Sequence, residues 1–142
     1  MTQERCEEIM RRYLTEVVAQ GKLELLPELA AEDMEDHTND TPGRAGLMQH
    51  VTGFRSAIPD LELELERVIA SDDGVVGLWT WTGTPAREFF GVPPTGVKVS
   101  CKVASVFQIK DGMLADYVVF ADAMGTAKQM GAEVKLPEGT HA

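Results

Sequence analysis

One carboxylate stands out as a residue that could carry chemistry. Asp122 ends a segment with the alternating pattern of a β-strand, which starts after the turn sequence Asp111-Gly112. Alternate residues of an extended strand share a face, so we expect Asp122 to lie on the same face as Val118 and Phe120. Apolar surroundings disfavour the charged form of a carboxyl group and raise its pKa from about 3.9. Asp122 is therefore the first candidate for a general acid or base.

Histidines are the next candidates for proton transfer, because their pKa lies near neutral pH. His37 follows the acidic run Glu32–Asp36. It either takes part in proton transfer or is a partly exposed residue stabilised by its acidic neighbours. His50 falls on the apolar stripe of an expected helix. It either contacts a bound substrate or has a structural role in the core or at its rim. His141 lies in the polar tail and has no expected role.

Aromatic side chains could form the walls of a binding site. Trp79 and Trp81 alternate on one face of an expected strand, where they could stack on a flat ligand. Packing in the core or at a dimer interface is the alternative. Both interpretations apply equally to three further aromatic residues, Phe54, Phe89 and Phe120.

Two polar side chains complete the candidate binding residues. Tyr13 lies on the apolar stripe of the first helix, and its hydroxyl could reach a pocket. Gln108 lies on the less apolar face of its strand and could donate a hydrogen bond to a ligand carbonyl. Lys102 shares that face, where an exposed lysine is the simplest interpretation.

The helices and strands that position these residues are expected to follow one another in a simple order. Apolar spacing at i, i+3, i+4 and i+7 predicts helices over 3–20 and 45–57, with a short helix around 23–31 between them. A short strand and a loop are expected over 32–44. Alternating patterns then predict strands from residue 61 onward, over 75–84, 97–109 and 113–122. Helices followed by a meander of strands indicate an α+β fold, with helices on one face of a strongly curved sheet that encloses a pocket.

Length and charge limit the classes of function. The 142 residues predict one domain over 1–142, with its core at about 5–131 and a polar tail over 132–142. A net charge of −10 argues against nucleic acids and anionic membranes as partners. No apolar run reaches the roughly 20 residues of a membrane span, and the N-terminus lacks the apolar core of a signal peptide. We expect Cys6 and Cys101 to be free thiols, as in a cytoplasmic protein.

Common catalytic and metal-binding motifs are missing from the sequence. It contains no Cys-x-x-Cys, His-Glu-x-x-His or Gly-x-Ser-x-Gly. The segment 91–98 has the glycines and lysine of a phosphate loop, but two prolines remove backbone N–H donors and the lysine does not follow the second glycine. The sequence therefore offers none of these motifs as a source of its chemistry.

Three segments, in the right order and spacing, resemble the SnoaL-like polyketide cyclases of the nuclear-transport-factor-2-like (NTF2-like) superfamily. They are Phe54–Leu61, with its Pro-Asp entry to the sheet, Glu88–Gly96, with Pro-Pro-Thr-Gly, and Asp111–Gly131, with Asp122 and Gln-Met-Gly. The resemblance covers residues 5–131. It differs from the usual pattern at Val118, Gln108 and Pro85.

The resemblance implies an NTF2-like α+β barrel, or cone, around a deep apolar pocket, without metal or cofactor, in a homodimer packed through the outer face of the sheet. In these cyclases the aspartate that matches Asp122 is the acid/base of an intramolecular aldol ring closure. A histidine is common near His37. The expected partner is a small hydrophobic or polycyclic substrate, bound by Gln108 and by the side chains Tyr13, His50, Phe54, Trp79 and Phe120.

Other functions remain open on the same fold, because function depends on the site and not on the fold. Isomerase, dehydratase, epoxide-opening or hydroxylase-component chemistry would keep the pocket and change the reaction. A ligand-binding domain without catalysis is the third alternative. We expect an enzyme that resembles the polyketide cyclases.

Overall fold

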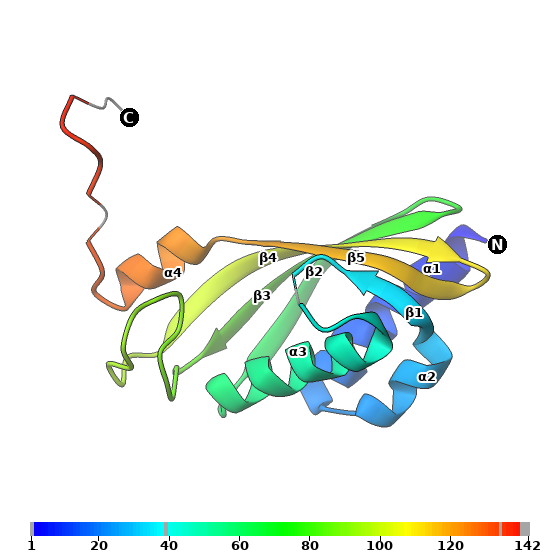
Figure 1. Ribbon diagram of the computed structural model, residues 1–142, viewed down its shortest axis with the longest axis horizontal. Coiled ribbons are helices and arrows are strands. Elements are labelled where there is room, and N and C mark those ends of the chain that lie inside the picture. Colours follow the sequence, from blue (N-terminus) through cyan, green and yellow to red (C-terminus); the bar gives the residue numbers. More distant parts are fainter. Residues whose placement is uncertain (1, 39, 134, 140–142) are drawn as a thin grey trace.

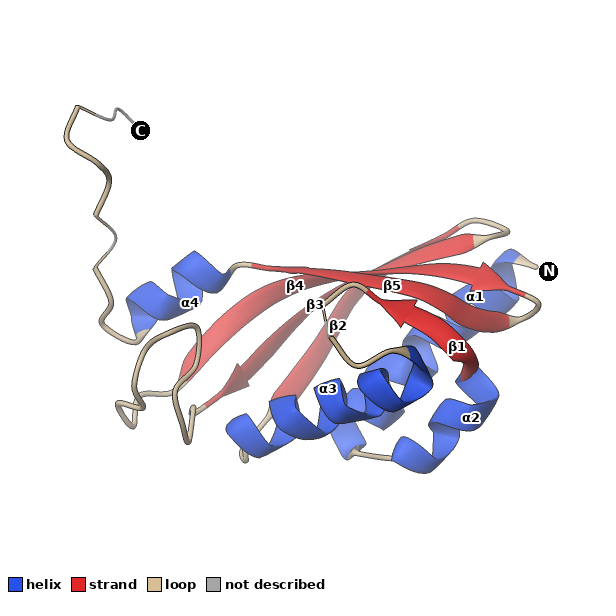
Figure 2. Ribbon diagram, viewed as in Figure 1, coloured by secondary structure: helices blue, strands red, loops and turns tan. Residues whose placement is uncertain are grey.

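Five strands form a single curved sheet in the computed structural model, which describes residues 2–38, 40–133 and 135–139 (Figures 1 and 2). The strand order is β1-β5-β4-β3-β2. β1 runs parallel to β5, and the other neighbours are antiparallel. β1 and β2 are free edges, so the expected cone is an open, mixed sheet and not a closed barrel. The strands are β1 Ala30–Asp36, β2 Glu62–Ala70, β3 Gly74–Gly83, β4 Val99–Lys110 and β5 Met113–Ala121.

Alternating burial along the strands explains which side chains reach the interior. On β3 every second residue is buried, including Val75, Trp79 and Trp81. On β4 the buried face carries Val99, Cys101, Val103, Ser105, Phe107 and Ile109. The period of two in the sequence therefore predicts the inner face of both strands correctly.

The β4–β5 hairpin turns at a pair of residues with positive φ. Asp111 has a φ of 53° and Gly112 a φ of 77°, as a two-residue hairpin turn with the right twist requires. Aspartate and glycine tolerate this conformation better than other residues. The turn sequence therefore fixes where β5 begins.

The first helix is predicted correctly in extent but changes type. Thr2 is the N-cap of α1 (Gln3–Arg12), and its hydroxyl accepts the N–H of Arg5 at 3.1 Å. It continues as a π-helical segment over Tyr13–Val18. In a π-helix residues five apart share a face, so Tyr13 and Val18 both turn toward the sheet.

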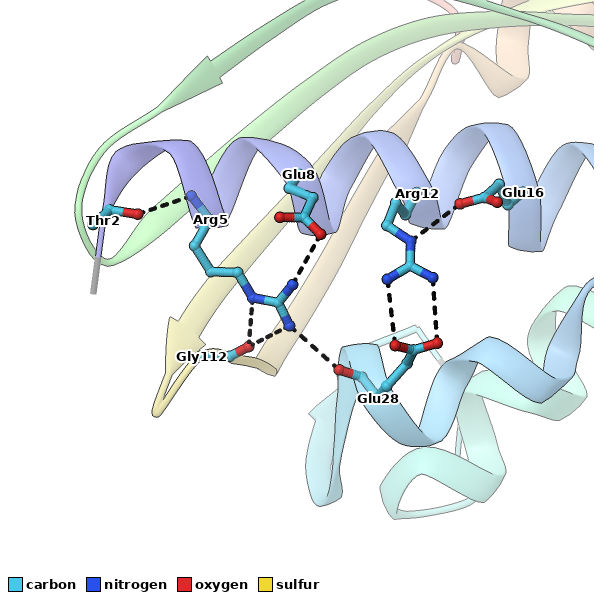
Figure 3. A network of polar contacts seen from close by, with 7 residues as sticks. All are labelled: Thr2, Arg5, Glu8, Arg12, Glu16, Glu28 and Gly112. Carbon is cyan, nitrogen blue, oxygen red and sulfur yellow. Dashed lines mark hydrogen bonds and ion pairs between the residues drawn. The ribbon is translucent and has the colours of Figure 1, made fainter.

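Two arginines of α1 connect it to its neighbours (Figure 3). Arg5 donates to the carbonyl of Gly112 in the β4–β5 turn at 3.2 and 3.3 Å. Arg12 binds both carboxylate oxygens of Glu28, at 3.2 and 3.4 Å, and it also binds Glu16 on its own helix. The planar guanidinium suits this paired geometry.

Three further α-helices complete the described part of the fold. A 3₁₀ turn (Leu23–Leu25) leads into α2 (Leu26–Leu29), which is shorter than the expected helix because β1 already begins at Ala30. α3 (Gly43–Ala57) lies across the same face of the sheet as α1 (Figure 1). α4 (Ala123–Gln129) follows β5 and was not predicted.

The core lies between α1, α3 and the concave face of the sheet. Ile9, Met10, Leu14, Val17 and Leu47 are among its fully buried side chains. Within the part of the chain that the structure describes, no helix is long and apolar enough to cross a membrane. Both cysteines are buried and unpaired, as predicted.

Candidate active site

A cavity of about 170 Å³ lies between the helices and the concave face of the sheet. The helices contribute Tyr13, Val18, His50, Val51 and Phe54. The strands contribute Trp79, Trp81, Val103, Tyr117, Val119 and Ala121, and the loop 84–98 contributes Phe89 and Phe90. A larger groove of about 710 Å³ lies at the β2–β3 turn, but it is open to solvent and contains no cluster of aromatic or histidine side chains.

Aromatic rings form most of the cavity wall. The ring of Phe54 packs edge-on against Trp79 and Trp81, with centroids 6.2 and 5.5 Å apart. Phe89 packs against Trp81 at 5.5 Å and against Phe90 at 4.4 Å. Such a wall suits a flat, apolar ligand.

The loop that carries Phe89 and Phe90 stands at the end of the sheet, next to the C-terminal end of α3 (Figure 1). Arg87 anchors it by donating to the carbonyl of Gly53 at 2.7 Å. Phe90 has a φ of 50° and is 41% exposed. It is therefore the most exposed aromatic ring of the cavity wall.

His50 is held by a buried carboxylate. Its Nδ1 lies 3.2 Å from Oδ2 of Asp36, whose side chain has no exposed surface. The other carboxylate oxygen accepts the N–H and the hydroxyl of Thr38, at 2.9 and 2.6 Å. Because Nδ1–H donates to the carboxylate, the neutral imidazole has its free lone pair on Nε2.

Burial alone would raise the pKa of Asp36. The hydrogen bonds from His50 and Thr38 outweigh it and hold that pKa below its ordinary value. The carboxylate is therefore ionised at neutral pH, and it fixes the orientation of His50.

A chain of buried polar groups lies across the cavity wall. Trp79 Nε1 donates to Ser105 Oγ at 3.0 Å. The Tyr117 hydroxyl shares hydrogen bonds with Ser105 and Tyr13. Burial raises the pKa of Tyr117 to about 12 despite these bonds, and burial raises the pKa of Tyr13 well above its ordinary value. Both phenols therefore keep their protons at neutral pH.

Six candidate residues named from the sequence come together at this cavity. The residues that line it are Tyr13, His50, Phe54, Trp79, Trp81 and Phe89. The rings of His50 and Tyr117 pack edge-on with centroids 5.8 Å apart, so His50 lies beside the tyrosine pair.

Asp122 lies outside the cavity. β5 ends at Ala121, and the exposed Asp122 is the N-cap of α4, where its Oδ1 accepts the N–H of Gly125 at 2.9 Å. It lines a shallow groove together with Glu66 and Lys102. The groove and the cavity share Trp79, Val103 and Ala121, but Asp122 lines only the groove.

Three further predicted residues also lie away from the cavity. His37 is half exposed at the sheet edge, with Nε2 2.8 Å from Asp116 Oδ2. Gln108 is exposed on β4, opposite Asp116 in the ladder. Phe120 is 62% exposed. His141 lies outside the described residues.

One group of side chains in the described residues offers the donors of a metal site. Ligand atoms of Glu35, His37 and Asp116 lie within 4.8 Å of one another at the sheet edge. His37 is already ion-paired with Asp116, and Glu35 is exposed. This geometry is that of a surface ion pair.

Sequence reasoning missed Asp36, Ser105 and Tyr117. Asp36 was hidden in an acidic run, yet it alternates with the buried Met34, and this alternation is the signal that places it inward. Tyr117 pairs with Asp36 across the parallel β1–β5 ladder, so both side chains reach the same face. That pairing cannot be deduced from the sequence of either strand.

Comparison with known proteins agrees with this architecture. The family model of the SnoaL-like polyketide cyclases matches residues 8–130. No curated protein matches the sequence significantly.

Solved structures share the fold at low sequence identity. TsrD from Streptomyces laurentii superposes with a TM-score of 0.84 at 22% identity, over 94% of this chain and 99% of that one. IdmH from Streptomyces antibioticus, a candidate polyketide cyclase, gives 0.74 at 25% identity, over 88% and 97%. AclR from Streptomyces galilaeus, a candidate hydroxylase, gives 0.76 at 23% identity, over 97% and 91%. With a family model that covers most of its length, this chain belongs to the SnoaL-like polyketide cyclase family.

Proposed function

We propose that this protein is a cofactor-independent enzyme that transfers protons on a small apolar carbonyl compound, as in an intramolecular aldol ring closure. The family membership supports a polyketide-type substrate, and the aromatic cavity supports an apolar one. The observation that carries the proposal is the pairing of His50, at the cavity wall, with the buried carboxylate of Asp36.

His50 is the base of the proposed reaction. Nε2 takes a proton from the carbon next to a substrate carbonyl, and the C–H electrons form an enolate. The enolate carbon then forms a bond to a second carbonyl carbon of the same molecule, which becomes an alkoxide. The imidazolium returns its proton to the alkoxide oxygen, so the enzyme ends in its starting state.

Asp36 acts through His50. Its ionised carboxylate holds Nδ1–H and stabilises the imidazolium that forms when Nε2 takes the proton. The cavity contributes by holding the two carbonyl groups close together, which can supply a large part of the rate increase.

Asp122 remains the alternative base, supported by its spacing from the turn, the Pro-Pro-Thr-Gly loop and the Gln-Met-Gly segment. His37 likewise remains an alternative residue for proton transfer. Each of these assignments predicts a different variant that loses activity, so one experiment separates them.

Deuterium exchange into 2-tetralone, a two-ring ketone, tests proton removal without knowledge of the natural substrate. Proton NMR in D₂O follows the loss of the signal next to the carbonyl. We expect the enzyme to accelerate this exchange and His50→Gln to slow it by about 10²-fold or more, as expected for loss of a general base. Asp36→Asn should slow it too, while Asp122→Asn and His37→Gln should retain it.

The opposite pattern would assign the base differently. Loss of exchange in Asp122→Asn with activity retained in His50→Gln would make Asp122 the base. An enzyme that binds 2-tetralone but leaves its exchange rate unchanged would favour a ligand-binding domain. Circular dichroism of each variant checks that the fold is retained.

We also propose the homodimer that the family resemblance implies. The exposed ring of Phe120, on the sheet face away from the cavity, supports an outer-face interface. Light scattering of Phe120→Glu tests it, and an unchanged mass of two chains in this variant would argue against the interface.

A further inference from the structure

The hydroxyl of Tyr117 lies beside two other hydroxyl groups, those of Ser105 and Tyr13. A phenol oxygen accepts hydrogen bonds and donates one. Ser105 Oγ accepts from Trp79 Nε1, so its own proton is free to be donated to Tyr117. Tyr13 is hydrogen-bonded to the same hydroxyl. When Ser105 and Tyr13 both donate to it, the O–H proton of Tyr117 is left for an acceptor in the cavity that it lines.

The surroundings of Tyr117 fix its ring as well as its hydroxyl. The ring packs against Phe107 at 5.1 Å and against Tyr13 at 5.9 Å, and it is 2% exposed. Its ladder partner on β1 is Asp36, the residue that holds His50. A ligand oxygen on Tyr117 therefore lies on the same side of the cavity as the proposed base.

The size of the cavity limits what can be enclosed. A volume of about 170 Å³ is close to that of cavities that hold a single benzene ring, which are about 150 Å³. Pockets for drug-sized molecules begin at about 300 Å³. A second ring can extend toward the mouth at Phe90, whereas a fused system of three or more rings exceeds the space.

We propose that the Tyr117 hydroxyl donates a hydrogen bond to a ligand oxygen, and that the ligand is a planar aromatic ketone or phenol of one or two rings. This inference rests on the proposed function in taking the aromatic cavity as the substrate site. It adds the group that binds the oxygen, and it assigns the carbonyl to the wall formed by β4 and β5. In an enolate, the same hydrogen bond would strengthen as negative charge develops on that oxygen.

Two ligands that differ by one oxygen test this contact. 2-Naphthol and naphthalene have the same rings, and only the first can accept a hydrogen bond from Tyr117. Ligand-observed NMR titrations give both dissociation constants for the wild type and for Tyr117→Phe. We expect Tyr117→Phe to weaken 2-naphthol by about fivefold, as for loss of a typical hydrogen bond, and to change naphthalene by less than twofold.

The naphthalene measurement is the control for folding and packing. Equal weakening of both ligands would mean that Tyr117 only packs, and no change in either would mean that it does not contact the oxygen. Binding of 2-hydroxyanthracene as tightly as 2-naphthol would overturn the size limit. Failure of the wild type to bind either two-ring ligand would overturn the ligand class.

The same titrations in His50→Gln separate this inference from the proposed reaction. His50→Gln should keep the preference for 2-naphthol over naphthalene, even where deuterium exchange is lost. A wild type without exchange activity that still shows the Tyr117-dependent preference would refute the reaction and retain the binding site.

Discussion

The Asp122 carboxylate caps α4 through the N–H of Gly125, and a side chain at position 125 would collide with it. This pair joins the end of β5 to the last helix. The N–H groups of a first turn have no partner within the helix, so a carboxylate at the N-cap satisfies one of them.

Replacing this cap should cost stability. We expect Asp122→Ala to lower the free energy of unfolding by about 1 kcal/mol. Asp122→Asn should cost much less, since asparagine caps as well as aspartate does. Urea denaturation followed by circular dichroism measures both. Equal losses in the two variants would show that the charge, and not the cap, matters at this position.

The stability that Asp36 contributes should depend on pH. Its folded pKa lies below the ordinary value of 3.8, so the stabilisation is complete above about pH 4 and is lost as the pH falls through the lowered pKa. Asp36→Asn should therefore destabilise by about 1–3 kcal/mol at pH 7 and by less at pH 3. Urea unfolding at both values measures the difference.

Asp33→Asn is the matched control for that experiment, because Asp33 is exposed on the same strand. It should change little at either pH. A loss in Asp36→Asn that is the same at pH 3 and pH 7 would contradict the role of the ionised carboxylate.

His37 should titrate at higher pH than an ordinary histidine. The hydrogen bond to Asp116 and the charge of that carboxylate raise its pKa above 6.5. Its stabilising effect is then complete below pH 6.5 and is lost as the pH rises through the raised pKa. NMR titration of the imidazole should show the pKa fall toward 6.5 in Asp116→Asn.

Glu35→Gln provides a comparison for His37, because Glu35 lies farther away, at 3.8 Å. It should lower the pKa of His37 less than Asp116→Asn does. An unchanged pKa in Asp116→Asn would mean that the ion pair does not form in solution.

Gly77 allows α1 to lie close to β3. A Cβ at this position would lie 2.8 Å from Met10 Sδ and 2.9 Å from Leu14 Cδ1. Gly77→Ala should destabilise by about 1–3 kcal/mol, as overpacking of a core does. The same substitution at Gly53, inside α3, meets only the flexible Arg87 at 3.8 Å and should stabilise by up to about 1 kcal/mol. Thermal unfolding of the two variants compares them directly, and a stable Gly77→Ala would show that α1 can shift.

The sequence predicts most of the fold because its patterns are local. The stripe of α1 and the alternation of β3 and β4 each depend on neighbouring residues, and each appears in the structure. α4 was missed because its seven residues, with Gly125 among them, give too short a pattern. The change to a π-helix after Arg12 leaves no mark in the apolar spacing.

The candidate site was harder to predict because it depends on which strands pair. The face of Trp79 follows from alternation on its own strand. The meeting of Asp36 with Tyr117 follows from the parallel pairing of β1 with β5, which joins distant parts of the chain. The spacing of the family motifs pointed to Asp122. The carboxylate beside the cavity is instead that of Asp36, on β1.

The aromatic wall described above contains both tryptophans of the chain. The tryptophan fluorescence of the protein therefore comes entirely from side chains that line its cavity. A ligand that binds against the indole rings will change this emission, so its binding can be followed without a label. Tryptophan fluorescence can therefore be used to screen collections of candidate substrates before a reaction is known.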